Sequence, residues 1–166
     1  KKEIAGEQSV EYAASLNNLA ELYGKLGNYK EEELLLLQSI GIKKKILGSD
    51  HSSYLKGINN LAVLYTKLGR TDEALALMQK VVDASKKYKI SRPVEYADRA
   101  SNLASIYTDM GKNNEAEKIY LEIIEVYKEN FGETFGDYTS ALNNLSVVYL
   151  QKGNYAQAND LLKKFT

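Results

Sequence analysis

The sequence has no cysteine and only one histidine, His51. Without cysteine the chain cannot form disulfide frameworks, thiolate zinc sites or cysteine nucleophiles. One histidine cannot supply a two-histidine metal site, and no Ser/His/Asp arrangement can be placed around it. The acidic residues scatter along the chain, and no glycine-rich phosphate loop occurs. We therefore expect no metal, no cofactor and no enzymatic activity.

Excess charge is also missing, because 22 basic residues balance 22 acidic ones. A neutral chain lacks the basic surface that attracts phosphate backbones, so we expect no nucleic-acid partner. No apolar run approaches the roughly 18 residues of a membrane span, so we expect no membrane partner either. With no signal peptide in the sequence, we expect a cytoplasmic location. Because the chain begins with Lys1 rather than Met, we expect it to be an excerpt of a longer protein.

An internal period of 42 residues organises what is present. Shifted against itself by this period, the sequence aligns without a gap, and five columns hold one residue type in all four units. These columns are Tyr12, Tyr54, Tyr96 and Tyr138; Asn18, Asn60, Asn102 and Asn144; Leu19, Leu61, Leu103 and Leu145; Tyr23, Tyr65, Tyr107 and Tyr149; and Gly27, Gly69, Gly111 and Gly153.

Each unit has the pattern of two helices. In the first, Leu16, Leu19, Tyr23 and Leu26 form one stripe of a 3.6-residue helix, and we expect this stripe to face the core. Gly27 then ends the helix, because glycine readily adopts the left-handed conformation that closes a helix. The connection to the second helix is very short, which predicts antiparallel neighbours.

Capping signals mark the start of the second helix. Asn28 with Glu31, and Asn154 with Gln157, have the spacing of a capping box. Pro93 suits the lead-in to a helix and would break one elsewhere. The predicted helices span 9–26, 28–47, 51–68, 70–89, 94–110, 112–131, 136–152 and 154–165.

Four helix pairs cannot hide their apolar faces singly, but stacked pairs bury a continuous core. The sequence therefore predicts an all-α fold, a right-handed α-solenoid of four antiparallel helix pairs. We expect residues 1–166 to form a single array whose repeats cover approximately 8–49, 50–91, 92–133 and 134–166.

The repeat resembles the tetratricopeptide repeat, a helix pair with Leu-(Gly/Ala), Tyr, Gly and Ala at fixed offsets. Leu19-Ala20, Tyr23 and Gly27 carry the first part of this motif. The small residue of the second helix is present as Ala74, Ala116 and Ala158. Glu32 departs from this column, and we expect either that its side chain reaches solvent or that the first pair packs more loosely.

Within this family, the 42-residue unit resembles the repeat of kinesin light chain. The segment from Leu47 to Tyr54, running on to Asn59-Asn60-Leu61-Ala62, looks like the repeat unit of that protein. The resemblance implies a superhelix whose concave surface is lined by the first helix of each pair. It also implies a non-catalytic protein–protein interaction module that holds an extended peptide or a partner helix in that groove.

Residues on the side of the first helices opposite the apolar stripe are the candidate binding residues. Two interpretations of the asparagines remain open: their amides bind a peptide backbone, as the resemblance implies, or they tie neighbouring helices together. The candidate groove residues are Asn17, Asn18, Lys56, Asn59, Asn60, Lys67, Asp98, Ser101, Asn102, Asp109, Asn143 and Asn144.

Charge along the predicted groove changes sign. Lys56 and Lys67 make one stretch basic, and Asp98 and Asp109 make the next acidic. A bound segment of complementary charge would be oriented by this pattern. The alternative is that these are ordinary solvated charges on helix faces.

The aromatic columns favour packing over binding. We expect Tyr23 and its equivalents to lie in the core, and Tyr12 and its equivalents to lie at contacts between units. His51 falls between two predicted helices, where we expect a turn residue.

A second functional hypothesis is an architectural arm, or a regulatory and peptide-sensing arm, of a larger multidomain protein. At the end of the chain, Leu161, Leu162 and Phe165 leave the last stacking face apolar. We expect self-association, or disorder, at this end.

Overall fold

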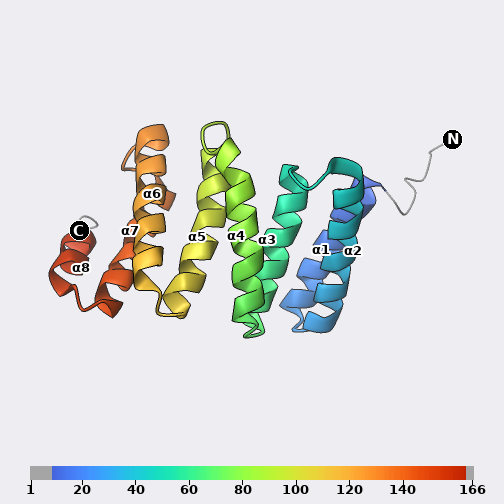
Figure 1. Cartoon of the computed structure of the whole chain (residues 1–166), viewed down its shortest axis with the longest axis horizontal. Coiled ribbons are helices and arrows are strands. Elements are labelled where there is room, and N and C mark those ends of the chain that lie inside the picture. The colour runs from blue at the N-terminus through green and yellow to red at the C-terminus, as the bar shows by residue number, and fades with distance from the viewer. Residues whose placement is uncertain (1–8, 164–166) are drawn as a thin grey trace. The chain divides into compact units, whose positions relative to one another are not determined.

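The computed structural model describes residues 9–163, in which every regular element is helical and none is a strand (Figure 1). Most elements begin or end within two residues of their predicted bounds. The elements are α1 (Val10–Lys25), α2 (Tyr29–Leu47), α3 (Ser52–Lys67), α4 (Thr71–Ser85), the short 3-10 helix η1 (Lys86–Tyr88), α5 (Pro93–Asp109), α6 (Asn113–Phe131), α7 (Gly136–Gln151) and α8 (Tyr155–Leu162).

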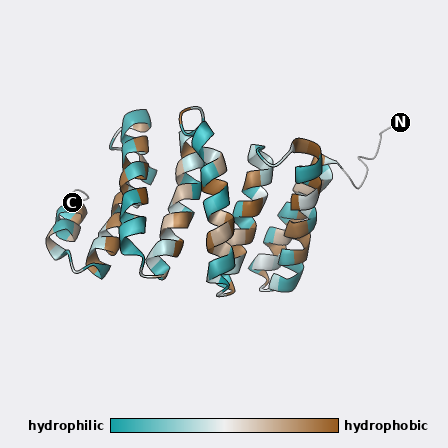
Figure 2. Ribbon diagram, viewed as in Figure 1, coloured by the Kyte–Doolittle hydropathy of each residue, from teal (hydrophilic) through white to brown (hydrophobic). Residues whose placement is uncertain are grey.

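Contacts divide the chain into two compact units, Lys1–Ala84 and Ser85–Thr166. In the first unit α1 packs on α2, and α2 packs on α3. In the second unit α5, α6, α7 and α8 pack in the same consecutive order. Figure 2 shows apolar and polar residues alternating around the helices. Each helix therefore has an apolar face to bury and a polar face to leave in water.

The glycine column ends the first helix of each pair as predicted. Gly111 has a φ of +70°, and the N–H of Lys112 reaches back to donate to the carbonyl of Tyr107 at 2.8 Å. The same closing bond recurs after the other three glycines of this column, which also have positive φ. Nothing lies within 4 Å of a Cβ built on Gly111, so the backbone conformation, and not lack of space, requires glycine here.

The predicted caps are partly correct. Asn28 Oδ1 accepts a hydrogen bond from the N–H of Glu31 at 3.4 Å, whereas the side chain of Asn154 makes no such bond. The prediction of a cap at Asn154 is therefore wrong. His51 is a turn residue as expected, since it caps α3 by accepting from the N–H of Ser53 at 3.1 Å. Pro93 is the first residue of α5.

One predicted helix is shorter than expected. The segment predicted as 70–89 leaves the α-helical conformation after Ser85 and tightens into η1. Lys89 stands at a column where the other long second helices have the apolar Leu47 and Phe131. Its ammonium instead donates to Glu122 Oε1 at 2.9 Å. A polar residue that seeks a carboxylate does not provide the packing that would extend α4 by another turn.

The inward stripe predicted for α1 is correct only in part. Leu16 is buried at 6% exposure, but Leu19 is 41% exposed and Leu26 is 71% exposed. The residues equivalent to Leu19 in α3 and α7, Leu61 and Leu145, are buried. Both α3 and α7 pack against the helix before them, whereas no described element lies before α1. The neighbouring helix, and not the local pattern, decides whether this column is buried.

A polar cluster joins α2 to α3. The hydroxyl of Tyr65 and the guanidinium of Arg70 both donate to Glu33 Oε1, each at 2.8 Å. The guanidinium carbon of Arg70 also lies 3.7 Å from the centroid of the Tyr65 ring. Tyr65 is 7% exposed, as predicted for its column, whereas Tyr23 and Tyr107 of the same column are only half-buried. In the second unit Lys152 donates to Glu117, which lies beside the equally buried Tyr149.

Two glycines distinguish a position where the backbone conformation requires glycine from a position where glycine only weakens the helix. We expect Gly111→Ala to lower the free energy of unfolding by about 1–2 kcal/mol, because alanine is strained at positive φ. Gly41 lies inside α2 with nothing within 4 Å of an added Cβ, so Gly41→Ala should raise it by about 0.5–1 kcal/mol. Urea unfolding followed by circular dichroism measures both. Equal effects of the two substitutions would contradict this reading of the repeat glycines.

Candidate functional site

Predicted groove residues of the first unit come together around a hollow of about 190 Å³. Asn17 and Glu21 reach it from α1, and Asn60, Val63 and Lys67 reach it from α3. The first helices of two successive pairs therefore form its walls, as the sequence predicted. Its remaining lining residues, Glu32 and Leu36, belong to α2.

The asparagines of this hollow are joined to each other. Asn60 Nδ2 donates to Asn17 Oδ1 at 3.3 Å, which connects α3 to α1. This bond supports the interpretation that the asparagines tie neighbouring helices together. It uses one of the two amide protons of Asn60 and one acceptor site of Asn17, so both amides keep hydrogen-bonding capacity for a ligand.

Glu32 is the unusual residue of the hollow. Its side chain is buried at 8% exposure, so the expectation that it reaches solvent is wrong. Space for the carboxylate comes from Gly24 on α1, where an added Cβ would lie 2.5 Å from Glu32 Oε2. In the later repeats the column of Gly24 holds larger residues and the column of Glu32 holds alanine. The two departures from the repeat therefore touch each other in space.

The Glu32 carboxylate has little to compensate its burial. Oε2 has no hydrogen-bond partner among the described residues. Loss of hydration raises the pKa of Glu32, and the positive charge of Lys67 opposes this rise. Glu21, the other acid of the hollow, is exposed and forms a 2.8 Å ion pair with Lys25. Glu32 is thus a buried acid without a direct partner, while Glu21 is an ordinary surface acid.

Lysines flank the same part of the first unit. Lys43 of α2 is 6% exposed, and its pKa is lowered first by burial and then by the charge of Lys56. Lys56 also lowers the pKa of Glu21 slightly, after the larger effect of Lys25. Lys43, which the sequence did not single out, is therefore near enough to the predicted basic residue Lys56 to feel its charge.

The second unit has a smaller hollow of about 100 Å³ that is acidic. Asp98 and Ser101 line it from α5, Asp137 and Asn144 line it from α7, and Tyr127 lines it from α6. Burial raises the pKa of Asp98, and the charge of Asp137 raises it further. The Tyr127 hydroxyl donates to Asp98 Oδ1 at a long 3.5 Å, which partly opposes that rise. The remaining lining residues are Ile123, Ser140 and Ala141.

None of the twelve predicted groove residues is buried. Six of them line one of the two hollows, and the structure places the other six elsewhere on the first helices. Those outside are Asn18, Lys56, Asn59, Asn102, Asp109 and Asn143.

Sequence reasoning passed over the residues of the second helices that line the two hollows. Leu36, Ile123 and Tyr127 look like core residues in sequence, because each belongs to an apolar stripe. The available signal was Glu32, an acid in a column of alanines. The repeat pattern shows the departure at Glu32 but not its contact with Gly24, eight positions earlier in the chain.

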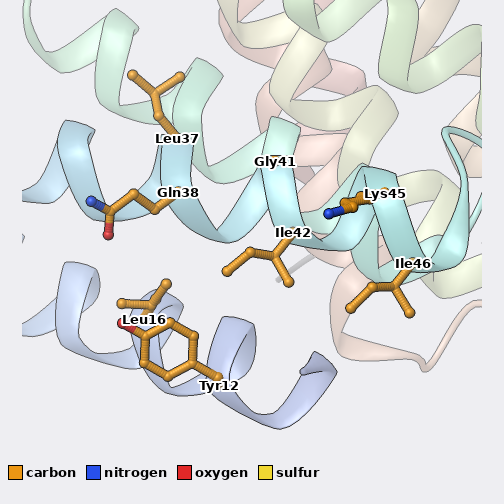
Figure 3. A pocket seen from close by; sticks show the side chains of 8 residues that line it. All are labelled: Tyr12, Leu16, Leu37, Gln38, Gly41, Ile42, Lys45 and Ile46. Carbon is orange, nitrogen blue, oxygen red and sulfur yellow. The ribbon is translucent and has the colours of Figure 1, made fainter. Parts of the chain in front are cut away.

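The largest of these hollows lies outside the predicted groove (Figure 3). It has a volume of about 460 Å³, and Tyr12 and Leu16 of α1 face several α2 side chains across it. Tyr12 is 37% exposed, whereas its equivalents Tyr54, Tyr96 and Tyr138 are 5% exposed or less. The hollow is therefore a stacking face that no described element covers. The other lining residues are Leu37, Gln38, Gly41, Ile42, Lys45 and Ile46.

The opposite end of the chain is also incompletely covered. Leu162 of α8 is 39% exposed and Tyr155 is 69% exposed. Leu161 is half-buried, and Phe165 lies outside the described residues. Self-association through this end stays a prediction.

Two classes of site are missing from residues 9–163. No group of three or more histidine, aspartate or glutamate side chains converges there in a way that could hold a metal ion. None of the helices in this range is long and apolar enough to cross a membrane.

The contact between Gly24 and Glu32 makes the effects of two substitutions depend on each other. In a Glu32→Ala background, Gly24→Ala should raise the free energy of unfolding by about 0.5–1 kcal/mol, as alanine does inside an open helix. In the wild-type background the same Gly24→Ala substitution should raise the free energy of unfolding by less, or lower it, because the new methyl group must first displace the Glu32 carboxylate. Urea unfolding of all four variants measures the coupling. Additive effects would contradict the contact.

Burial of Glu32 also predicts a pH dependence of stability. Folded Glu32 keeps its proton at a higher pH than the unfolded residue, whose ordinary pKa is 4.5. Protons are therefore taken up on folding in the window above 4.5, and this contribution to stability is lost as the pH rises. Lys67 and Glu21 line the same hollow, and the ion pair with Lys25 lowers the pKa of Glu21.

The difference in free energy of unfolding between wild type and Glu32→Gln isolates this contribution. Wild type should become more stable relative to the variant when the pH is lowered from 8 to 5. Urea unfolding at the two values measures the change. A difference that stays constant with pH would show that Glu32 is not desolvated.

Comparisons with known proteins agree with the repeat geometry. Two family models, both described as tetratricopeptide repeat, match residues 96–164 and residues 13–53 and 56–88. No curated protein matches the sequence. Among solved structures, nearly identical TPR-like repeats of a kinesin light chain candidate from Podosopora anserina are 25% identical, with a TM-score of 0.84. The match covers 98% of this chain and 76% of that one.

Two further structures share the fold. A second crystal structure of the Podosopora anserina repeats is 25% identical and has a TM-score of 0.82. This match covers 97% of this chain and 76% of that one. BtubC (BKLC) from P. vanneervenii has a TM-score of 0.83 at 16% identity, and the match covers 92% of this chain and 61% of that chain. The identity to BtubC is low enough that this match shows the fold alone.

Repeats of this kind form all-α solenoids, which are generally non-catalytic scaffolds for protein partners. The two family models together match both units of the structure. The chain belongs to the tetratricopeptide repeat family, and its repeats resemble those of kinesin light chain.

Proposed function

We propose that the chain is a non-catalytic interaction module that binds an extended peptide, or a partner helix, along the faces of its first helices. The observation that carries this proposal is the arrangement of the predicted groove residues. All twelve remain accessible, and half of them gather in a hollow of one unit or the other. Polar side chains left accessible around concave surfaces are suited to holding a ligand in place.

Amides suit a peptide ligand in particular. An extended peptide presents N–H and C=O groups at regular spacing, and each asparagine offers both donors and an acceptor. Asn17 and Asn60 line the first hollow, and Asn144 lines the second. The charges add direction, because the second hollow contains Asp98 and Asp137 and would favour basic groups.

The same hollows do not favour catalysis. The chain's single histidine, His51, caps α3 and lines neither hollow. In the second hollow, Ser140 donates its hydroxyl proton to the carbonyl of Gly136 at 3.1 Å, as an ordinary helix serine does. No activated nucleophile is therefore assembled among the described lining residues.

Selection of peptides from a displayed random library, followed by fluorescence anisotropy of the selected sequences, tests the proposal. In a variant with both Asn60→Ala and Asn144→Ala, each lost amide removes about 0.5–1.5 kcal/mol of hydrogen bonding. Affinity should fall about tenfold or more. The matched control carries Asn114→Ala and Asn159→Ala, which remove two exposed asparagines that line neither hollow.

Unchanged affinity in the first variant would reject the groove, and so would an equal loss in the control. Circular dichroism of both variants checks that the helical content is preserved.

A further inference from the structure

Glu32 is buried at a cost that the described structure does not recover. A carboxylate placed in a column of alanines loses hydration, and its Oε2 atom has no hydrogen-bond partner within residues 9–163. No ion pair joins it to a described residue, although Lys67 lines the same hollow and its positive charge acts on Glu32. Gly24 is itself unfavourable inside a helix, yet it is the residue that makes room for the carboxylate. Two destabilising residues in contact indicate a role other than stability.

The position of Glu32 gives that role a chemical character. Glu32 lines the 190 Å³ hollow of the first unit, together with the joined amides of Asn17 and Asn60. An acid lining a partly enclosed hollow attracts a cation far more strongly than the same acid at an open surface. Leu36 and Val63 supply apolar wall to the same hollow. A carboxylate beside apolar wall fits a cationic group carried on a hydrocarbon stem.

Extending the peptide groove proposed above, on which this assignment rests, we propose that the hollow around Glu32 is a specificity pocket for one basic side chain of the bound peptide. The ammonium of a lysine or the guanidinium of an arginine would pair with the Glu32 carboxylate. Its methylene stem would lie along Val63 and Leu36, and the peptide backbone would lie across Asn17 and Asn60. Glu32 is the specificity-determining residue of this pocket.

The repeat pattern limits the pocket to the first helix pair. The positions equivalent to Glu32 in the later pairs are Ala74, Ala116 and Ala158, each of which is 1% exposed or less. Alanine provides no charge, so the described part of the array has one pocket of this kind, whereas the acidic second hollow is lined by other columns. Such a single site sets the register in which a peptide binds.

Blocked pentapeptides of the form Ac-Ala-Ala-X-Ala-Ala-NH2, with X as lysine, arginine, norleucine or glutamate, are the probes. Their binding to the full chain is followed by NMR, through the side-chain amide signals of Asn17 and Asn60. We expect the lysine and arginine peptides to bind at least about tenfold more tightly than the norleucine peptide, which has a similar stem without the charge. The glutamate peptide should bind most weakly.

Two variants of the chain assign the preference to Glu32. Glu32→Gln should reduce the ratio of lysine to norleucine affinities to about twofold or less. Gly24→Ala keeps the charge but displaces the carboxylate, so it should also lower the ratio. The matched control, Glu31→Gln, removes a charge from the adjacent residue, which does not line the hollow, and should leave the ratio unchanged.

Equal binding of the lysine and norleucine peptides would overturn the pocket, as would a preference that survives Glu32→Gln. No binding of any probe at millimolar concentration would overturn it as well. Spermidine tests whether the pocket prefers a free polyamine to a basic side chain of a peptide. Tighter binding of spermidine than of the lysine peptide would overturn the proposal that the ligand is a peptide. Peptides that bind regardless of charge but are lost in the Asn60→Ala, Asn144→Ala variant would reject the pocket and leave the proposed groove standing.

Discussion

Burial of each helix's apolar face by its neighbour is the interaction on which the rest of the structure depends. A helix of 16 residues such as α1 or α3 is marginal in water, and an amphipathic one becomes stable only when its apolar face is covered. The tyrosine column shows the effect directly. Tyr54 is 3% exposed on α3, which packs on α2, whereas Tyr12 is 37% exposed on α1, which no described helix precedes. One residue type in one column thus has two environments.

Polar contacts between the second helix of one pair and the next pair supplement this apolar packing in some repeats. Glu33 and Glu117 occupy one column of the second helices, and each meets a buried tyrosine and a cation near the turn inside the next helix pair. A carboxylate held by a hydroxyl and a cation has its charge compensated, so it can sit at a helix–helix contact without a large cost. The intermediate repeat has Leu75 in this column. The array therefore does not use the same polar contact in every repeat, even though its two tyrosine columns and the column of Leu19 are constant.

Glu32 shows the opposite use of a carboxylate. Glu33, its neighbour in sequence, is held by Arg70 and Tyr65, and its pKa is lowered first by the Arg70 guanidinium. Glu32 projects from another side of α2, into the first pair, where loss of hydration raises its pKa. Adjacent glutamates on one helix turn thus have opposite pKa shifts because they face different neighbours. The binding surface that we propose would derive its specificity from such local departures, since the repeated columns are the same in every pair.

The sequence by itself determined the helix pairs, the family and most helix bounds, α4 excepted, because a 42-residue period, a 3.6-residue stripe and a left-handed glycine are properties of the local chain. It also predicted that the twelve candidate residues lie on accessible faces, and none of them is buried, since the side of a helix opposite its apolar stripe faces away from the core. The exposure of Leu19 and the contact of Glu32 with Gly24 were decided only by the tertiary structure. Whether a side chain is covered, paired or left without a partner depends on the helix packed against it, and periodicity within one helix carries no information about that neighbour.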